Sequence, residues 1–366
     1  MWRRAQAIGD KDVAREMRRV FRRILPDSRH DPAAVAKAYG QLMYKPSAWG
    51  HTEIRGERKF IEKCFNVGLR DESCEFEQLT KRAVLVSDSL LLSHGPDAPY
   101  RHLGEDRRTD VDVDDNMQPR GSDSRTTHYG IHCPDLAALG TWLLEAEPLI
   151  KSGLAWYLPS YSTRTEFVSS RASAATHRRS YPISQVAAVD YIIRGGRVID
   201  SSESNPVKDR LVRPVLQIDL PFIEGVTLSD FSKITVDEFD SYSGFRGFLR
   251  TSFLSMDEAL NAEQSQVELA KLRLEIEDQV SAMQTELRAA KRKRSLGVVG
   301  ATVASTAALL VAVEGSVMER VLTTLGLTTA GTFWGAIKDR VENGPRAIQS
   351  GKWYYVWILA QKSRAL

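Results

Sequence analysis

The chain has 366 residues, of which 42% are hydrophobic and 27% are charged. These are values of folded globular proteins, so the composition excludes wholesale disorder, a collagen-like repeat and a transporter with many membrane passes. The net charge of +3 is too small to make the whole surface a binding site for polyanions. The length predicts two or three structural units. The few cysteines, at positions 64, 74 and 133, lack metal-type spacing and fit a reducing compartment.

The first part of the chain, residues 1–82, is predicted to be a helical region. Between residues 10 and 25, apolar residues recur at helical spacing and leave a basic opposite face. The apolar positions are Val13, Met17, Val20, Phe21 and Ile24, and the basic ones are Arg15, Arg18, Arg19, Arg22 and Arg23. This pattern predicts either a contact with a polyanion such as nucleic acid or acidic lipid, or a surface helix whose arginines are solvated. Further helices are predicted from Asp31-Pro32 to Met43 and from Ile54 to Leu69.

Residues 83–255 are predicted to form an α+β domain of mixed helices and strands. Aliphatic and β-branched residues predict strands at 83–92, 128–132 and 154–158, and Pro134-Asp135 is typical of a helix start between the last two. Strand, helix and strand at this spacing indicate a sheet covered by a helix. The polar and acidic stretch 95–127, which contains several prolines, is predicted to be a long mobile loop.

The second half of this domain is also expected to alternate between helices and strands. Residues 183–194 predict a helix that ends at Gly195-Gly196. The aliphatic run from Leu211 to Leu220 predicts a strand that Pro221 terminates. Apolar residues from Phe239 to Met256 recur on one side of a predicted helix.

Residues 257–294 contain neither proline nor glycine and predict a long amphipathic helix. Its apolar residues step by three and four, close to a heptad repeat, at Leu269, Leu272, Ile276, Val280, Met283, Leu287 and Ala290. Such a short apolar stripe indicates that the helix packs against another helix, but it does not show whether that helix belongs to the same chain or to a second copy. Two interpretations therefore remain open. The helix is either a stalk or coiled coil between the domain and a membrane, or a helix packed on its own domain.

Residues 295–340 are predicted to form a hydrophobic two-helix hairpin. No charged residue occurs from Leu296 to Val313 or from Val321 to Ile337, and both runs approach the roughly 20 residues that span a bilayer. Basic residues flank the outer ends of the pair at Lys291, Arg292, Lys293, Arg294, Lys338 and Arg340. This charge distribution is typical of a membrane hairpin with both ends in the cytoplasm.

Small residues within the two runs predict close helix packing. Ala304 and Ala308 stand four apart in the first run, and Gly331 and Gly335 form a G-x-x-x-G step around Trp334 in the second. The hairpin therefore predicts contact with membrane lipid and self-association, together with the helix at 257–294. The alternatives are a hairpin buried in the core of a cytoplasmic protein and a hairpin that inserts only on a trigger.

The aromatic tail, residues 341–366, contains an apolar run from Trp353 to Leu359 that is too short to cross a bilayer. Trp and Tyr prefer the membrane interface, but the same run is also suited to the domain core. The two locations are equally compatible with the sequence.

The common catalytic and phosphate-binding motifs do not occur in the sequence. His128 and His132 stand on one face of a predicted strand and Cys133 on the other, so we expect no metal site and no cofactor. The sequence favours a non-enzymatic, membrane-associated protein that faces the cytoplasm and acts as an anchor or an assembly-dependent membrane effector. The alternative is a soluble binding module for a protein or, less favoured, a nucleic acid. An enzyme would need a pocket that gathers His94, His128 and His132.

Overall fold

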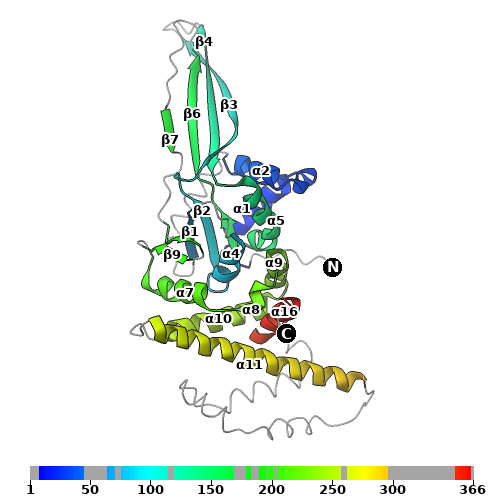
Figure 1. The fold of residues 1–366 in the computed structure, drawn as a ribbon. Helices are drawn as coiled ribbons and strands as arrows, with labels where there is room; N and C mark the ends of the chain where they lie inside the picture. Colours follow the sequence, from blue (N-terminus) through cyan, green and yellow to red (C-terminus); the bar gives the residue numbers. More distant parts are fainter. Residues whose placement is uncertain are drawn as a thin grey trace.

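The computed structural model describes residues 8–44, 64–70, 76–113, 119–168, 179–182, 189–195, 197–201, 204–256, 262–295 and 351–363. These residues form a mixed α and β fold with two sheets, as the composition and patterning predicted. In Figure 1 an antiparallel sheet projects at one end, a sheet surrounded by helices lies in the middle, and a long helix crosses the other end.

The central sheet has the strand order β5-β2-β1-β8-β9. Its strands are β1 (Cys64–Leu69), β2 (Ser89–His94), β5 (Ala155–Tyr157), β8 (Tyr191–Arg194) and β9 (Arg197–Asp200). The first four run parallel and β9 is an antiparallel edge strand. Helix α4 (Phe76–Val84) connects β1 to β2 as a crossover. All six residues of β2 are buried, as expected for a parallel strand that is covered on both faces.

Two elements of this sheet correct the predictions from sequence. Cys64–Leu69 is a strand rather than the end of a helix, and Tyr191–Arg194 is a strand rather than the end of another. Both are short apolar runs, whose periodicity does not distinguish a buried strand from a buried helix. Residues 189 and 190 of the second predicted helix are not helical either, and the remaining parts, 54–63 and 183–188, lie outside the described residues.

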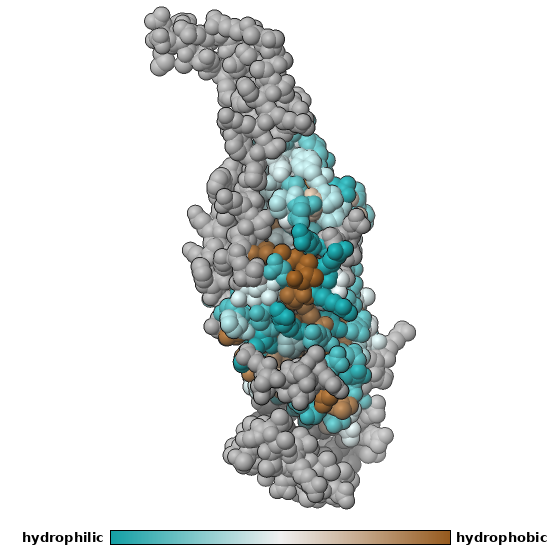
Figure 2. All heavy atoms as spheres, turned by 60° about the vertical axis from the view of Figure 1, so that its left-hand side comes forward, coloured by the Kyte–Doolittle hydropathy of each residue, from teal (hydrophilic) through white to brown (hydrophobic). Residues whose placement is uncertain are grey.

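The exposed edge of the central sheet is β9. Figure 2 brings forward the side on which β9 lies in Figure 1 and shows a hydrophobic area within a largely hydrophilic face. Ile199 of β9 is 49% exposed. This side of the molecule therefore presents apolar surface near the edge strand β9 (Figure 2).

The projecting sheet has the order β3-β4-β6-β7 and is antiparallel throughout. Its strands are β3 (Tyr100–Val113), β4 (Pro119–His132), β6 (Tyr161–Val168) and β7 (Arg179–Pro182). The predicted mobile loop at 95–127 was wrong, because β3 and β4 pair along most of that range. The apolar residues Leu103, Tyr129 and Ile131 are buried at the base of this sheet, where β3 meets a helix. The rest of the hairpin extends away from the helices, so it lacks the alternating apolar pattern that predicts a half-buried strand.

Helices at the amino-terminal side form one layer: α1 (Lys11–Arg23), α2 (Pro32–Tyr44), α5 (Leu136–Glu145) and α6 (Glu147–Ser152), with a 3-10 turn η1 (Pro26–His30). The predicted apolar face of α1 is confirmed, because Val13, Met17, Val20, Phe21 and Ile24 are all buried. Asp10 and Asp135 cap α1 and α5 by accepting backbone N–H bonds. A Cβ atom on Gly140 of α5 would lie 1.7 Å from the carbonyl oxygen of Pro32, so glycine permits α2 and α5 to touch.

A second group of helices covers the opposite end: α7 (Pro206–Gln217), α8 (Pro221–Glu224), α9 (Leu228–Asp237) and α10 (Phe239–Ser255). The predicted strand at Leu211 to Leu220 was wrong, since most of it belongs to α7. The reason lies upstream, where the Asn205 side chain caps the helix and Pro206 occupies its first turn. The predicted helix at Phe239 to Met256 is confirmed as α10, with Tyr242, Phe245, Leu249 and Phe253 buried.

The last two described helices are α11 (Ala262–Ser295) and α16 (Lys352–Ser363). Four residues of the predicted apolar stripe of α11 are buried within this chain: Leu269, Leu272, Ile276 and Val280. Within the apolar run of the tail, Tyr355, Val356 and Leu359 of α16 are fully buried, and the other four residues are half-buried. The predicted hairpin beyond Ser295 lies outside the described residues. Within the described part of the chain, no helix has the length and apolar character needed to cross a membrane.

Candidate functional site

One candidate functional region is the junction at which α11 and α16 are held on the domain, because the predicted hairpin lies between these two helices in the chain. Helix α16 packs on α8, α9, α10 and α11. The Tyr355 hydroxyl and the Thr235 hydroxyl lie 2.8 Å apart, and the Tyr355 backbone N–H donates to Ser241 Oγ at 2.8 Å. Burial raises the pKa of Tyr355 well above its usual range, so the ring stays neutral in the core.

Opposite charges on α11 and α16 influence each other near the start of α16. The Lys352 ammonium lies 4.2 Å from the ring centroid of Phe248 and 4.9 Å from that of Trp353. Burial lowers the pKa of Lys352, and the negative charge of Glu275 on α11 opposes that shift. Burial also raises the pKa of Glu275, although Lys352 opposes it. Each helix therefore contributes one partly buried charge to this contact.

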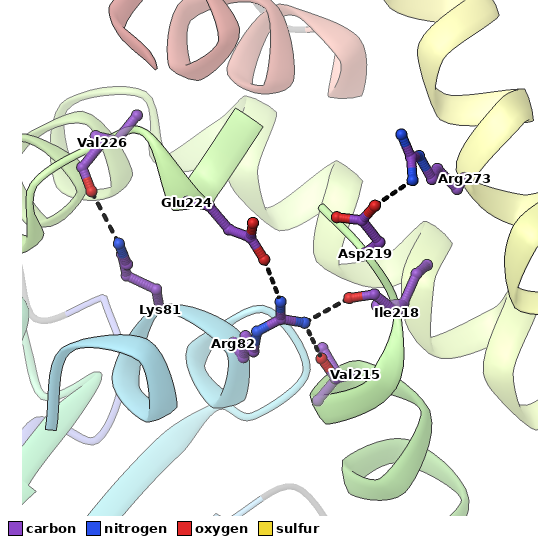
Figure 3. A network of polar contacts seen from close by, with 8 residues as sticks. All are labelled: Lys81, Arg82, Val215, Ile218, Asp219, Glu224, Val226 and Arg273. Carbon is purple, nitrogen blue, oxygen red and sulfur yellow. Dashed lines mark hydrogen bonds and ion pairs between the residues drawn. The ribbon is translucent and has the colours of Figure 1, made fainter. Parts of the chain in front are cut away.

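Polar contacts fix the surface on which α11 rests (Figure 3). Arg82 of α4 donates to the backbone carbonyl of Val215 at 3.1 Å and to the Glu224 carboxylate at 2.6 Å. Lys81, also on α4, donates to the carbonyl of Val226 at 2.9 Å. These bonds hold the turns around α7 and α8, where Asp219 forms an ion pair with Arg273 of α11. The central sheet is thus connected to α11 through α4 and these turns.

The predicted packing positions Ala304, Ala308, Gly331, Trp334 and Gly335 lie outside the described residues, as do Lys338 and Arg340. The other predicted flanking residues, Lys291, Arg292, Lys293 and Arg294, fall in the last turn and a half of α11. The structure therefore places the basic cluster at the carboxyl end of α11, where cations are also favoured by the helix dipole.

The predicted polyanion-binding arginines of α1 separate into two groups. Arg15, Arg19, Arg22 and Arg23 are exposed, and the first two pair with Asp12 and Glu16 on the same helix. Arg18 is different, because its Nε donates to the carbonyl of Lys151 at 2.9 Å and ties α1 to α6. Four of the five predicted arginines thus share an exposed helix surface, and the fifth has a structural contact.

The histidines lie in separate environments near the base of the projecting sheet. His94, at the carboxyl end of β2, is buried, and its Nδ1 lies 2.9 Å from the Tyr157 hydroxyl. Burial lowers the pKa of His94 to about 4, which the charge of Asp97 opposes, so the ring is neutral near pH 7. His128 lies further out on β4, where its Nδ1 is 3.2 Å from the Glu105 carboxylate. The three histidines therefore do not gather in one site, and no group of three or more possible metal ligands occurs among the described residues.

His132 has the most specific environment of the three. Its Nδ1 lies 2.8 Å from the carbonyl oxygen of Ala98, and its Nε2 lies 2.7 Å from Ser162 Oγ. Sequence analysis missed Ser162, which lies on β6 and is brought to His132 only by the pairing of β4 with β6. The sequence placed His128 and His132 on one face of a strand, because they stand an even number of positions apart, but it did not identify the side chains that they contact.

Comparison with known proteins gives no relative for this chain. No protein-family model, curated protein or solved structure matches it. Any functional assignment therefore depends on the residues and contacts described above.

Proposed function

We propose that this chain is a membrane-associated protein whose α and β domain is anchored at the cytoplasmic face by the hydrophobic hairpin at 295–340. The observation that carries the proposal is the pair of uncharged runs, Leu296 to Val313 and Val321 to Ile337, with basic residues at both outer ends. As a helix, the first run would measure about 27 Å against a hydrocarbon core of about 30 Å. Apolar helices of this length are stable in a bilayer, and basic residues at their outer ends favour the cytoplasmic side of the membrane.

The junction of α11 and α16 supports this proposal. The segment 296–350 follows α11 and precedes α16, and these two helices contact each other on the same side of the domain (Figure 1). A hairpin requires its two ends to lie on one side of the membrane, and α11 and α16 both pack at the same end of the domain (Figure 1). The buried contacts of Leu272, Ile276 and Tyr355 would keep both helices attached to the domain.

Self-association through the hairpin is part of the same proposal. Ala304 with Ala308 and Gly331 with Gly335 would permit close approach of helices within a bilayer. The buried stripe of α11 packs on its own domain, so we assign the association to the hairpin rather than to the described part of α11. Such assemblies would serve either as an anchor or as a membrane effector.

Flotation with phospholipid vesicles tests the proposal. The full chain is expected to float with vesicles and to resist extraction by alkaline carbonate. Replacement of residues 296–337 by a Gly/Ser linker of equal length should leave the chain in the soluble fraction, while α11 and α16 stay in place. Carbonate-resistant flotation of the linker variant, or a full chain that stays soluble with vesicles, would contradict the anchor.

A second candidate function is a soluble binding module whose hairpin is buried core. The exposed arginines of α1, Arg15, Arg19, Arg22 and Arg23, favour it, because a row of solvated guanidinium groups suits phosphate contacts. In that case the full chain would bind nucleic acid with an affinity that falls steeply with salt. Replacement of the four arginines by alanine would weaken binding and reduce the salt slope.

A further inference from the structure

The Ser162 hydroxyl and the His132 imidazole form a hydrogen-bonded pair whose proton positions follow from the contacts. A backbone carbonyl accepts hydrogen bonds and cannot donate them, so the contact of Nδ1 with the Ala98 oxygen places the ring proton on Nδ1. Nε2 of the neutral ring then carries a lone pair. With this tautomer, the Ser162 hydroxyl donates to Nε2, 2.7 Å away.

This arrangement has the three parts of an activated serine. The nucleophile and the base lie within hydrogen-bond reach, and a third group fixes the orientation and tautomer of the base. Here the third group is the carbonyl of Ala98 rather than a carboxylate. A carbonyl still accepts the Nδ1–H bond when the ring becomes cationic, but it supplies less electrostatic stabilisation than a carboxylate.

The two residues are held on paired strands. Ser162 lies opposite Gly130 in the pairing of β6 with β4, two positions from His132. The backbone N–H of His132 also donates to the carbonyl of Ser160 at 2.8 Å. Groups on strands are positioned more accurately than groups on loops, which favours a reactive geometry.

An exposed aromatic ring lies beside the pair. Ser162 is only partly buried, whereas His132 is 8% exposed. The ring of Tyr100, which is 44% exposed, approaches the His132 ring edge-on at 6.0 Å between centroids. A Cβ atom on Gly130 would lie 2.5 Å from that tyrosine ring, so Tyr100 extends over Gly130 beside Ser162. An exposed aromatic ring next to the hydroxyl is a suitable surface for an aromatic or alkyl ester.

We propose that Ser162 and His132 form a nucleophile and general base for acyl transfer from carboxylic esters. Ser162 Oγ bonds to the acyl carbon while its proton moves to His132 Nε2. The bond between the acyl carbon and the leaving oxygen then breaks, and Nε2 returns the proton to that oxygen. Water next attacks the acyl-serine while Nε2 accepts a water proton, and transfer of that proton to Ser162 Oγ releases a carboxylic acid and the free serine. This activity does not depend on the proposed anchor and would replace the expectation of a non-enzymatic protein.

A fluorophosphonate probe on the full chain, with peptide mapping by mass spectrometry, tests the pair. We expect an adduct on Ser162, no adduct there in Ser162→Ala, and labelling about a hundredfold slower in His132→Gln. Ser160→Ala is the matched control, because the Ser160 hydroxyl is buried two residues away and has no hydrogen-bond partner among the described residues. This control should label like the parent chain.

The variant Ser162→Cys gives a second test of the pair. Its thiol should react with iodoacetamide faster in the His132 chain than in the His132→Gln chain. It should also hydrolyse p-nitrophenyl acetate with release of one equivalent of p-nitrophenol in a burst. Absence of a Ser162 adduct on the folded parent chain, or equal labelling rates with and without His132, would overturn the proposal and leave Ser162 as a hydrogen-bond partner only.

Discussion

At the scale of single residues, three buried polar side chains in or beside the strands have well-defined partners. His94, His132 and Asp190 all lie in or beside β strands, and each contacts groups from a segment distant in sequence. These contacts cannot be predicted from sequence periodicity, because periodicity indicates which face of a helix or strand is apolar and does not identify the partner of a polar residue. Two of them give predictions that can be tested by titration or by exchange of one side chain.

His94 predicts a loss of stability in acid. The ring is 1% exposed, and its pKa in the folded chain is about 4, compared with about 6.5 when unfolded. Because the folded pKa is lowered, this contribution to stability is complete above pH 6.5 and declines as pH falls towards 4. The free energy of unfolding should drop by about 2 to 3 kcal/mol from this residue between pH 7 and pH 4.5.

Urea unfolding at the two pH values measures that loss. His94→Gln is the matched variant, since glutamine can still bond to the Tyr157 hydroxyl and does not titrate. The difference between pH 7 and pH 4.5 should be smaller in the variant by about the same 2 to 3 kcal/mol. Identical acid sensitivity in both chains would show that His94 is not the residue responsible.

The ion pair of Asp190 with Lys208 predicts a large effect of a single substitution. Lys208 Nζ lies 2.8 Å from Asp190 Oδ2, both side chains are 2% exposed, and the same oxygen accepts the Asn66 backbone N–H. Lys208→Met would bury the carboxylate without its ammonium partner and should cost about 3 to 5 kcal/mol in unfolding free energy.

The double variant Asp190→Asn with Lys208→Met is expected to recover much of that loss, because no buried charge remains. Lys233→Met, at an exposed position of α9, serves as the control and should change stability by less than about 0.5 kcal/mol. Equal costs for Lys208→Met and Lys233→Met would contradict the pairing.

At the scale of elements, close contacts between helices depend on particular glycines. Gly140→Ala would drive Cβ into the backbone of Pro32, which cannot move independently of α2. Gly247, inside α10, has no atom within 4 Å of its Cβ position. The first substitution should therefore destabilise the chain, and Gly247→Ala should stabilise it by about 0.5 to 1 kcal/mol through helix propensity.

Thermal unfolding of the two alanine variants, compared with the parent chain, measures these opposite shifts. An increase in melting temperature for Gly247→Ala together with a decrease for Gly140→Ala is expected. A Gly140→Ala chain as stable as the parent would mean that α2 and α5 do not touch at this position.

The sequence predicted elements well where one face is apolar and the other charged, as in α1 and α10. It predicted poorly where that contrast is missing. The run around Leu211 to Leu220 is aliphatic enough for a strand, yet the Asn205 cap and Pro206 begin a helix before it. The hairpin of β3 and β4 is rich in polar and charged residues, so its sequence carries little of the alternation that identifies a strand.

The candidate sites differ in how far the sequence could predict them, because some depend on local patterns and others on contacts between distant segments. The flanking basic cluster and the apolar runs are local patterns, so sequence analysis found them directly. The aromatic tail left two locations open, and its burial as α16 depends on α9 and α10, which are distant in sequence. Ser162 and His132 are 30 positions apart and meet only through strand pairing.

At the scale of the whole molecule, the proposed chemistry and the proposed attachment lie in different parts of the fold. The Ser162 and His132 pair lies at the base of the projecting sheet, whereas α11 and α16 hold the ends of the proposed anchor at the other end (Figure 1). An anchored chain would therefore present the projecting sheet away from the bilayer. Substitutions at Ser162 or His132 should therefore leave membrane attachment unchanged, and substitutions in the hairpin should leave the reactivity of Ser162 unchanged.

The anchor is tested most directly by one charge in the middle of each apolar run. Ala304→Arg with Thr328→Arg should cost about 2.5 to 3.5 kcal/mol per site in a bilayer. Ala304→Leu with Thr328→Leu is the control of similar bulk. Vesicle flotation after carbonate extraction should recover the parent and leucine chains with lipid and leave the arginine chain in solution. Equal recovery of the arginine and leucine chains, in either fraction, would contradict insertion of the hairpin.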